Sequence, residues 1–348
     1  MYIKNKELKI PLIQGGMGVG ISLGNLAGHV AKHEAMGVIS TADTGFMEPD
    51  FWKNPNASNL RGLEKEINKA KKIANGNGLI AINAMVATTY YVESVKTAVQ
   101  AGIDCVISGA GLPLELPALV KGYDTAIAPI VSSAKAANVI CRVWDKKYQV
   151  IPDFIVIEGS EAGGHLGFSK EELQNNTAKP LLEILQEVLV IIKPFEEKYG
   201  RKIPVFVAGG IYTNGDVKTF MDAGADGVQV ATRFIATYEC DASMAYKQVF
   251  LNAGKDDIQI VQSPVGMPGR ALRTPLIERL EKEKRISPKK CTLCLHACDV
   301  KTTPYCITNA LIEAVKGNYE EGLFFCGSNA WKMNRIVSVQ ELIQELMG

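Results

Sequence analysis

The chain has 348 residues, a formal net charge of +1, 47% hydrophobic and 22% charged residues. Because the charges are spread along the sequence without a basic block, its composition argues against nucleic acid as a partner. The first residues lack an apolar signal core and no apolar run approaches the roughly 18 residues of a membrane span, so we expect a cytoplasmic protein without membrane contact.

A short β-branched run, a glycine-containing turn and an amphipathic stretch alternate along most of the chain. Such alternation is typical of βαβ units around a parallel sheet. Eight strands is the number that closes a (β/α)8 barrel, also called a TIM barrel. The predicted strands are residues 8–13, 37–40, 79–83, 105–108, 126–130, 154–158, 205–208 and 227–230.

Helical segments are predicted between these strands. In residues 180–199 the apolar side chains recur with helical spacing, as a helix packed on a sheet requires. Residues 47–59 contain two prolines and two aromatic residues without periodicity, and we expect a loop over the barrel mouth there. The predicted helices are residues 60–74, 92–101, 114–121, 133–143, 180–199 and 214–223.

An open doubly wound sheet is the competing architecture. It would need a Gly-x-Gly-x-x-Gly turn after the first strand, leading into a helix and followed by an acidic residue about 20 positions on. The glycines of residues 15–20 do not show that context. We therefore predict an α/β fold: a barrel over residues 1–270, followed by a cysteine-rich, mainly helical extension over residues 271–348.

Small residues follow the seventh and eighth predicted strands, where barrel enzymes often bind phosphate. Gly209 and Gly210 follow strand seven, and Ala231 and Thr232 follow strand eight. Their backbone amides could approach an anion closely, and Thr232 adds a hydroxyl donor. The competing interpretation is that these glycines only form tight turns. The pair of loops at the expected strands favours a phosphate site.

A glycine-rich loop with a histidine follows the sixth predicted strand, which ends in Glu158. The loop contains Gly163 and His165. Histidine exchanges a proton near neutral pH, which suits a base beside a redox cofactor. A lone histidine is more often structural, but a place at the barrel mouth favours a catalytic role.

Two further segments bring candidate ligand contacts to the mouth. The glycine-rich run after strand one includes Gly16 and Met17, where backbone could lie against a flat ring. Asn83, at the end of strand three, could hydrogen-bond the same ligand, although a turn-forming role would explain it as well.

Together these segments resemble the nitronate monooxygenase family, formerly called 2-nitropropane dioxygenases, and the similar type II enoyl-acyl-carrier-protein reductases. The resemblance covers about residues 8–273. Its motifs are Pro-Leu-Ile-Gln-Gly-Gly-Met-Gly, Glu-Ala-Gly-Gly-His, Ala-Gly-Gly-Ile, Gln-Val-Ala-Thr-Arg-Phe and Ser-Pro-Val-Gly-Met-Pro-Gly-Arg, the last from residue 263 to residue 270.

The resemblance implies a barrel that contains FMN, with His165 as the catalytic residue. It implies contacts with the rest of the flavin from Asn83, Glu158 and Gly163. It implies phosphate contacts from Gly210, Gln229, Val230, Ala231 and Thr232.

Two positions depart from the family pattern. Position 158 is often Gln in the monooxygenases, and Glu is closer to the reductase branch. A buried carboxylate needs a cation, a proton or a donor, whereas an amide does not. Ala231 stands where Gly is common, which a backbone phosphate contact tolerates if φ is negative there.

Five of the eight cysteines lie after residue 290. Four of them have the spacing C-x2-C-x3-C-x7-C: Cys291, Cys294, Cys298 and Cys306. Clustered thiols in a reducing compartment indicate a soft-metal site, either zinc or an iron–sulfur cluster. The alternative is four reduced thiols in a helix-and-loop segment that caps the barrel. The spacing matches neither the common zinc-finger pattern nor the usual ferredoxin pattern. We also predict helices at 307–316 and 339–347. We expect the extension either to cover the barrel mouth or to mediate a homodimer.

These observations favour an FMN-dependent oxidoreductase that denitrifies alkyl nitronates. The alternative is an NAD(P)H-dependent reductase of a small-molecule enoyl thioester, which Glu158 favours. A flavin and metal module that passes electrons to a partner protein is a third class. A non-redox phosphate-binding barrel fits less well, because no lysine or paired carboxylates stand at the strand ends.

Overall fold

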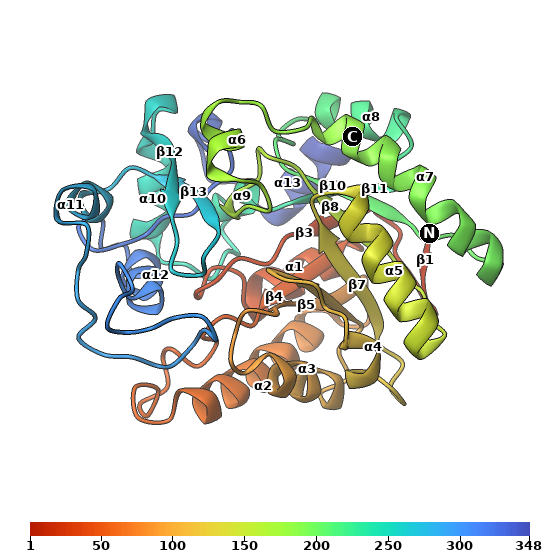
Figure 1. Cartoon of the computed structure of the whole chain (residues 1–348), viewed down its shortest axis with the longest axis horizontal. Coiled ribbons are helices and arrows are strands. Elements are labelled where there is room, and N and C mark those ends of the chain that lie inside the picture. The colour runs from red at the N-terminus through yellow and green to blue at the C-terminus, as the bar shows by residue number, and fades with distance from the viewer.

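The computed structural model describes residues 1–348, and eight parallel strands close a barrel at its centre (Figure 1). The sequence-predicted fold class is confirmed. All eight predicted strands are present, although the first is shorter and begins later than expected. In chain order the barrel strands are β3 (Leu12–Gln14), β4 (Met36–Ser40), β5 (Leu79–Met85), β6 (Cys105–Gly109), β7 (Ala126–Val131), β8 (Ile155–Glu158), β10 (Val205–Ala208) and β11 (Gly227–Val230).

Apolar side chains from alternate strand positions fill the barrel interior. Phe154 and Phe206 meet edge to face there, with their ring centroids 5.6 Å apart. The hairpin of β1 (Tyr2–Ile3) and β2 (Lys6–Glu7) adds Ile3 to the same cluster. The interior is therefore packed with side chains, which leaves the ends of the strands as the place for a site.

Helices surround the barrel because the outward face of each strand is apolar as well. The expected loop at residues 47–59 is wrong from residue 55 onward, since α2 begins there with a proline at its first position. The helices up to residue 252 are α1 (Gly24–Lys32), α2 (Pro55–Ala74), α3 (Tyr91–Gln100), α4 (Leu116–Leu119), α5 (Ala134–Tyr148), α6 (Lys170–Gln174), α7 (Leu181–Tyr199), α8 (Asn214–Asp222), α9 (Thr232–Ile235) and α10 (Met244–Asn252).

A small antiparallel sheet lies outside the barrel, in the order β12-β13-β9. It consists of β9 (Gly164–His165), β12 (Ile258–Gln262) and β13 (Pro268–Leu272). His165 is the register partner of Gly269. This sheet therefore ties the histidine loop after β8 to a hairpin about 100 residues later in the chain.

The C-terminal part contains α11 (Pro275–Glu283), α12 (Ile307–Val315), α13 (Val339–Met347) and the short 3-10 helix η2 (Ala330–Lys332). A second 3-10 helix, η1 (Lys255–Asp257), precedes β12. In Figure 1, α11 and α12 lie at the opposite side of the molecule from β1. The helices predicted at 307–316 and 339–347 are confirmed. The division into a barrel and a separate extension at residue 270 stays a prediction. None of the helices combines the length and the apolar character needed to cross a bilayer.

Candidate active site

A cavity of about 430 Å³ opens at the carboxyl ends of the barrel strands, a size typical of small-molecule sites. It brings together the twelve residues that the sequence proposed for catalysis or cofactor binding, although they come from six separate segments. These are Gly16, Met17, Asn83, Glu158, Gly163, His165, Gly209, Gly210, Gln229, Val230, Ala231 and Thr232.

The loops after β10 and β11 meet at one side of the cavity. Gly209 and Gly210 have φ values of 102° and 79°, a conformation that disfavours other residues. A Cβ on Gly210 would lie 2.1 Å from Oε2 of Glu161. Both glycines therefore hold a backbone conformation that another residue would adopt only with strain, and a side chain at Gly210 would also have to displace the Glu161 carboxyl.

Glycine is also required where the other loops approach the mouth. A Cβ on Gly16 would lie 2.5 Å from Cβ of Asn83. A Cβ on Gly163 would lie 2.4 Å from the carbonyl carbon of Cys326. The first contact packs the ends of the first and third strands together, and the second brings the C-terminal region against the loop after the sixth.

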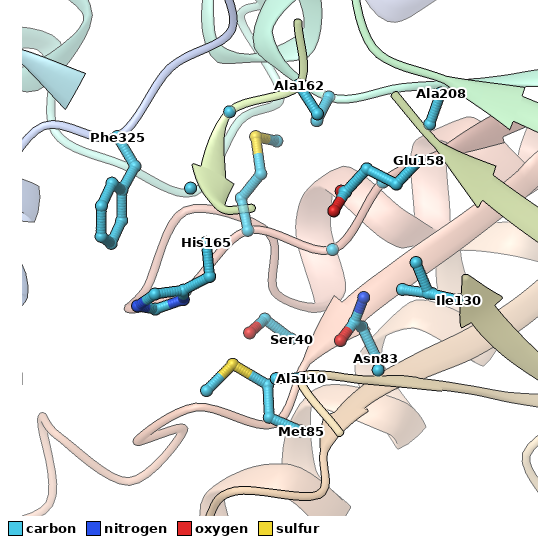
Figure 2. A pocket seen from close by; sticks show the side chains of 18 of the residues that line it. Ser40, Asn83, Met85, Ala110, Ile130, Glu158, Ala162, His165, Ala208 and Phe325 are labelled. Carbon is cyan, nitrogen blue, oxygen red and sulfur yellow. The ribbon is translucent and has the colours of Figure 1, made fainter. Parts of the chain in front are cut away.

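His165 projects into the cavity from β9 (Figure 2). Its Nε2 lies 2.7 Å from Oγ of Ser263, and its ring meets Phe325 edge to face with centroids 5.0 Å apart. Burial lowers the pKa of His165 to about 4. The imidazole is therefore neutral at physiological pH. Ser263 occupies one ring nitrogen, and no protein group hydrogen-bonds Nδ1.

Glu158 ends β8 and extends into the cavity, as does Asn83 from β5 (Figure 2). Its carboxyl group has neither an ion-pair nor a hydrogen-bond partner, and burial raises its pKa to about 8. With no cation and no donor beside it, this half-buried carboxyl is expected to keep its proton. Glu158 is thus neutral at pH 7 and can donate a hydrogen bond, as an amide at this position would.

Asp43 is a buried polar group of the mouth that the sequence did not indicate. Its carboxylate accepts hydrogen bonds from Tyr90 Oη at 2.8 Å, Asn59 Nδ2 at 3.2 Å and Thr308 Oγ1 at 2.7 Å. Burial raises its pKa, while the three donors oppose that shift. The bond to Thr308 fixes the start of α12 against the barrel, across 265 positions of sequence.

The wall formed by residues 325–330 was also missed. No local pattern marks these residues, because their role comes from contacts with distant loops. Ser263, in contrast, begins one of the motifs that carry the family resemblance, so a signal for it was present.

The structure does not support the metal site predicted at Cys291, Cys294, Cys298 and Cys306. No group of three or more His, Cys, Asp or Glu side chains is arranged to hold a metal ion. The thiols also differ in environment: Cys291 is exposed, whereas Cys294 is partly buried and lines the cavity.

Comparisons with known proteins agree with this arrangement. The family model described as nitronate monooxygenase matches residues 2–348. A probable nitronate monooxygenase of Bacillus subtilis is 22% identical over 99% of this chain and 97% of its own length. A dehydrogenase of Mycobacterium tuberculosis that acts on a 5-hydroxy-7a-methyl-1-oxo-octahydro-1H-indene-4-carboxyl-CoA is 26% identical over 79% of this chain. The match spans 66%, just under two thirds, of that dehydrogenase.

Two solved structures have the same fold. FabK from Thermotoga maritima superimposes with a TM-score of 0.74 at 23% identity, covering 98% of this chain and 92% of FabK. Nitroalkane oxidase from Streptomyces ansochromogenes superimposes with a TM-score of 0.72 at 18% identity, covering 97% of this chain and 95% of the oxidase. With the family match across the whole barrel and its mouth, the chain belongs to the nitronate monooxygenase family and is an oxidoreductase.

Proposed function

We propose that this protein uses FMN to oxidise alkyl nitronates. The observation that carries the proposal is the convergence of a half-buried, neutral His165 and the loops after β10 and β11 on one cavity at the strand ends. FMN, when bound, supplies the redox chemistry, and the protein supplies binding and orientation.

The residues of the mouth fit FMN. The loops after β10 and β11 would hold its phosphate through Gly209, Gly210 and the stretch from Gln229 to Thr232. The flat ring would lie along Gly16, Met17, Asn83, Glu158 and Gly163. Oε1 of Gln229 is buried without a hydrogen-bond partner, as expected of an acceptor that a donor group of the bound ligand would satisfy.

His165 would bind and orient the nitronate. When the Ser263 hydroxyl donates to Nε2, the neutral ring carries its proton on Nδ1. Nδ1–H would then donate a hydrogen bond to a nitronate oxygen. A nitronate is already an anion, so this role needs a donor and no strong base, which agrees with a pKa of about 4.

An NAD(P)H-dependent reduction of an enoyl thioester is the second candidate. The neutral carboxyl of Glu158 favours it, because the reductase branch has Glu at this position. The C-terminal region also lines the cavity with apolar side chains that would suit an acyl chain, namely Val265, Met267, Leu295, Ile307 and Leu311. Similarity to a CoA-ester dehydrogenase supports the same class of substrate.

Anaerobic mixing separates the two candidates. The FMN-loaded protein is mixed with an alkyl nitronate, NADH or NADPH while flavin absorbance is followed. Bleaching by nitronate alone supports the first function, and bleaching by a pyridine nucleotide supports the second. Bleaching by neither, in a protein that binds FMN, contradicts both and favours electron exchange with a protein partner. The cytoplasmic location and the homodimer stay predictions.

A further inference from the structure

A short C-terminal segment, residues 327–329, is clamped onto the loops of the proposed phosphate site. The backbone N–H of Gly327 donates to Thr232 Oγ1 at 2.9 Å, and that of Ser328 donates to the carbonyl oxygen of Glu161 at 3.1 Å. Nδ2 of Asn329 donates to the carbonyl oxygen of Gly210 at 2.7 Å. The segment thus contacts the loops after β8, β10 and β11 at once, and its three residues line the cavity.

The bond from Gly327 determines what the Thr232 hydroxyl can do. A hydroxyl has one proton to donate and lone pairs to accept with. Because Thr232 Oγ1 accepts from Gly327 and no protein acceptor lies within reach of its own proton, that proton is available to a ligand. An anion in the cavity would be such an acceptor.

Ser328, another residue of the same wall, carries a second hydroxyl. Its Oγ is buried and has no hydrogen-bond partner. A buried hydroxyl without a partner is uncommon, because its desolvation is not compensated. Neighbouring Gly327 and Asn329 are hydrogen-bonded to the loops after β11 and β10, so an acceptor between those loops would lie beside Ser328.

We propose that Ser328 and Thr232 both donate hydrogen bonds to the phosphate monoester of FMN, so that the C-terminal extension supplies part of the cofactor site. This inference rests on the proposed function. A phosphate group brings three strong acceptor oxygens, and hydrogen bonds to charged acceptors are the stronger kind. Two free hydroxyl protons beside glycine backbone suit this ligand better than a neutral one.

The test compares FMN with riboflavin, which has the same ring and lacks the phosphate. Flavin-free protein is titrated with each ligand, and binding is followed by the quenching of flavin fluorescence. Ser328→Ala should weaken FMN by about tenfold or more and leave riboflavin unchanged. Ser132→Ala is the matched control, because Ser132 lines the same cavity after β7, and it should leave the ratio of the two affinities unchanged.

The stability of the flavin-free protein separates a ligand role from a structural one. Because Ser328 Oγ has no partner to lose, Ser328→Ala should leave the melting temperature unchanged or raise it. As a second variant, Thr232→Ser keeps the hydroxyl and should bind FMN like the wild type, whereas Thr232→Val should lose affinity for FMN selectively.

Equal weakening of FMN and riboflavin by Ser328→Ala, or no weakening of either, would overturn the inference. If the wild-type protein binds riboflavin as tightly as FMN, no phosphate contact exists and the inference is wrong. The proposed use of a flavin would not be contradicted by that result. If the wild-type protein takes up neither flavin, the proposed function fails as well.

Discussion

The Nε2 atom of His165 lies 2.7 Å from the hydroxyl oxygen of Ser263, although the two residues are 98 positions apart in the sequence. The pairing of β9 with β13 creates this contact, because Gly269 faces His165 in the small sheet and Ser263 lies in the hairpin before it. The hydrogen bond restricts the ring to one orientation and directs Nδ1 to the other side.

Ser263→Ala should therefore lower kcat by about three- to tenfold, the scale of one neutral hydrogen bond. The pH at which activity is lost should also shift, since Nε2 would lose its partner. Ser263→Thr keeps the hydroxyl and should retain both properties. Steady-state kinetics across pH measure this, and a kcat loss without any change in the pH profile would contradict the positioning role.

His165→Ala should lower turnover by roughly 10- to 10²-fold, the scale of losing one hydrogen bond to a charged substrate, while the FMN content stays at the wild-type level. The reason is that His165 orients the substrate and does not hold the phosphate in the proposed arrangement. Flavin absorbance of the purified variant and its turnover with an alkyl nitronate check the two halves. Undiminished turnover would remove His165 from the mechanism.

Glu158 should make stability depend on pH. Its pKa is about 8 in the folded protein and near 4.5 in an unfolded chain, so the folded state keeps a proton that the unfolded state has lost between these values. The stabilisation from Glu158 is complete below pH 4.5 and disappears as the pH rises through 8.

The free energy of unfolding of Glu158→Gln, relative to that of the wild type, should consequently increase by about 2 kcal/mol from pH 5 to pH 8.5. This is less than the full pKa shift implies, because the carboxyl borders the cavity. Urea unfolding of the flavin-free proteins at both pH values measures the difference, and other titrating groups cancel in the comparison. An equal difference at both pH values would show that Glu158 is ionised already.

Gly210→Asp should expel FMN. The new side chain would meet Glu161 and place a carboxylate where the phosphate is proposed to lie. Gly200→Asp is the control, because Gly200 also has a left-handed φ, 62°, but lies in open space after α7. Absorbance at the flavin band reports cofactor content, and full content in Gly210→Asp would place the phosphate elsewhere.

Thr308→Val should destabilise the protein by about 1–3 kcal/mol, because Asp43 is buried and would lose one of its three hydrogen bonds. Thr302→Val is the control. Thr302 is exposed and contacts Asp299 at 3.4 Å, so that change should cost under about 0.5 kcal/mol. Denaturant midpoints measure both, and equal effects would mean that the bond to Asp43 contributes little.

Local sequence was sufficient for most of the barrel. Short β-branched runs such as residues 205–208 match the observed strand β10, because a strand buried on both faces leaves little choice of residue. The helix expected at 180–199 matches the observed α7, because its apolar side chains form one long stripe that packs on the barrel. Glycines at the ends of strands marked the mouth because a positive φ, as at Gly209 and Gly210, or a close approach, as at Gly16, disfavours other residues.

The cysteines show where local pattern was insufficient. Their spacing predicts a metal site, but spacing does not fix where each thiol points, and Cys291 is exposed whereas Cys294 lines the cavity. A metal site needs convergence in three dimensions, which only the packing of the chain decides.

By itself the sequence determined the closed parallel barrel, the glycine-rich loops at its mouth and the histidine within them, because each depends on residues close together in the chain. The tertiary structure alone decided that Ser263 hydrogen-bonds His165 and that Thr308 hydrogen-bonds Asp43. It also decided that residues 327–329 hydrogen-bond the loops after β8, β10 and β11. These contacts link segments 95 to 265 positions apart, and hydrogen bonds between such distant residues leave no periodicity that a sequence could reveal.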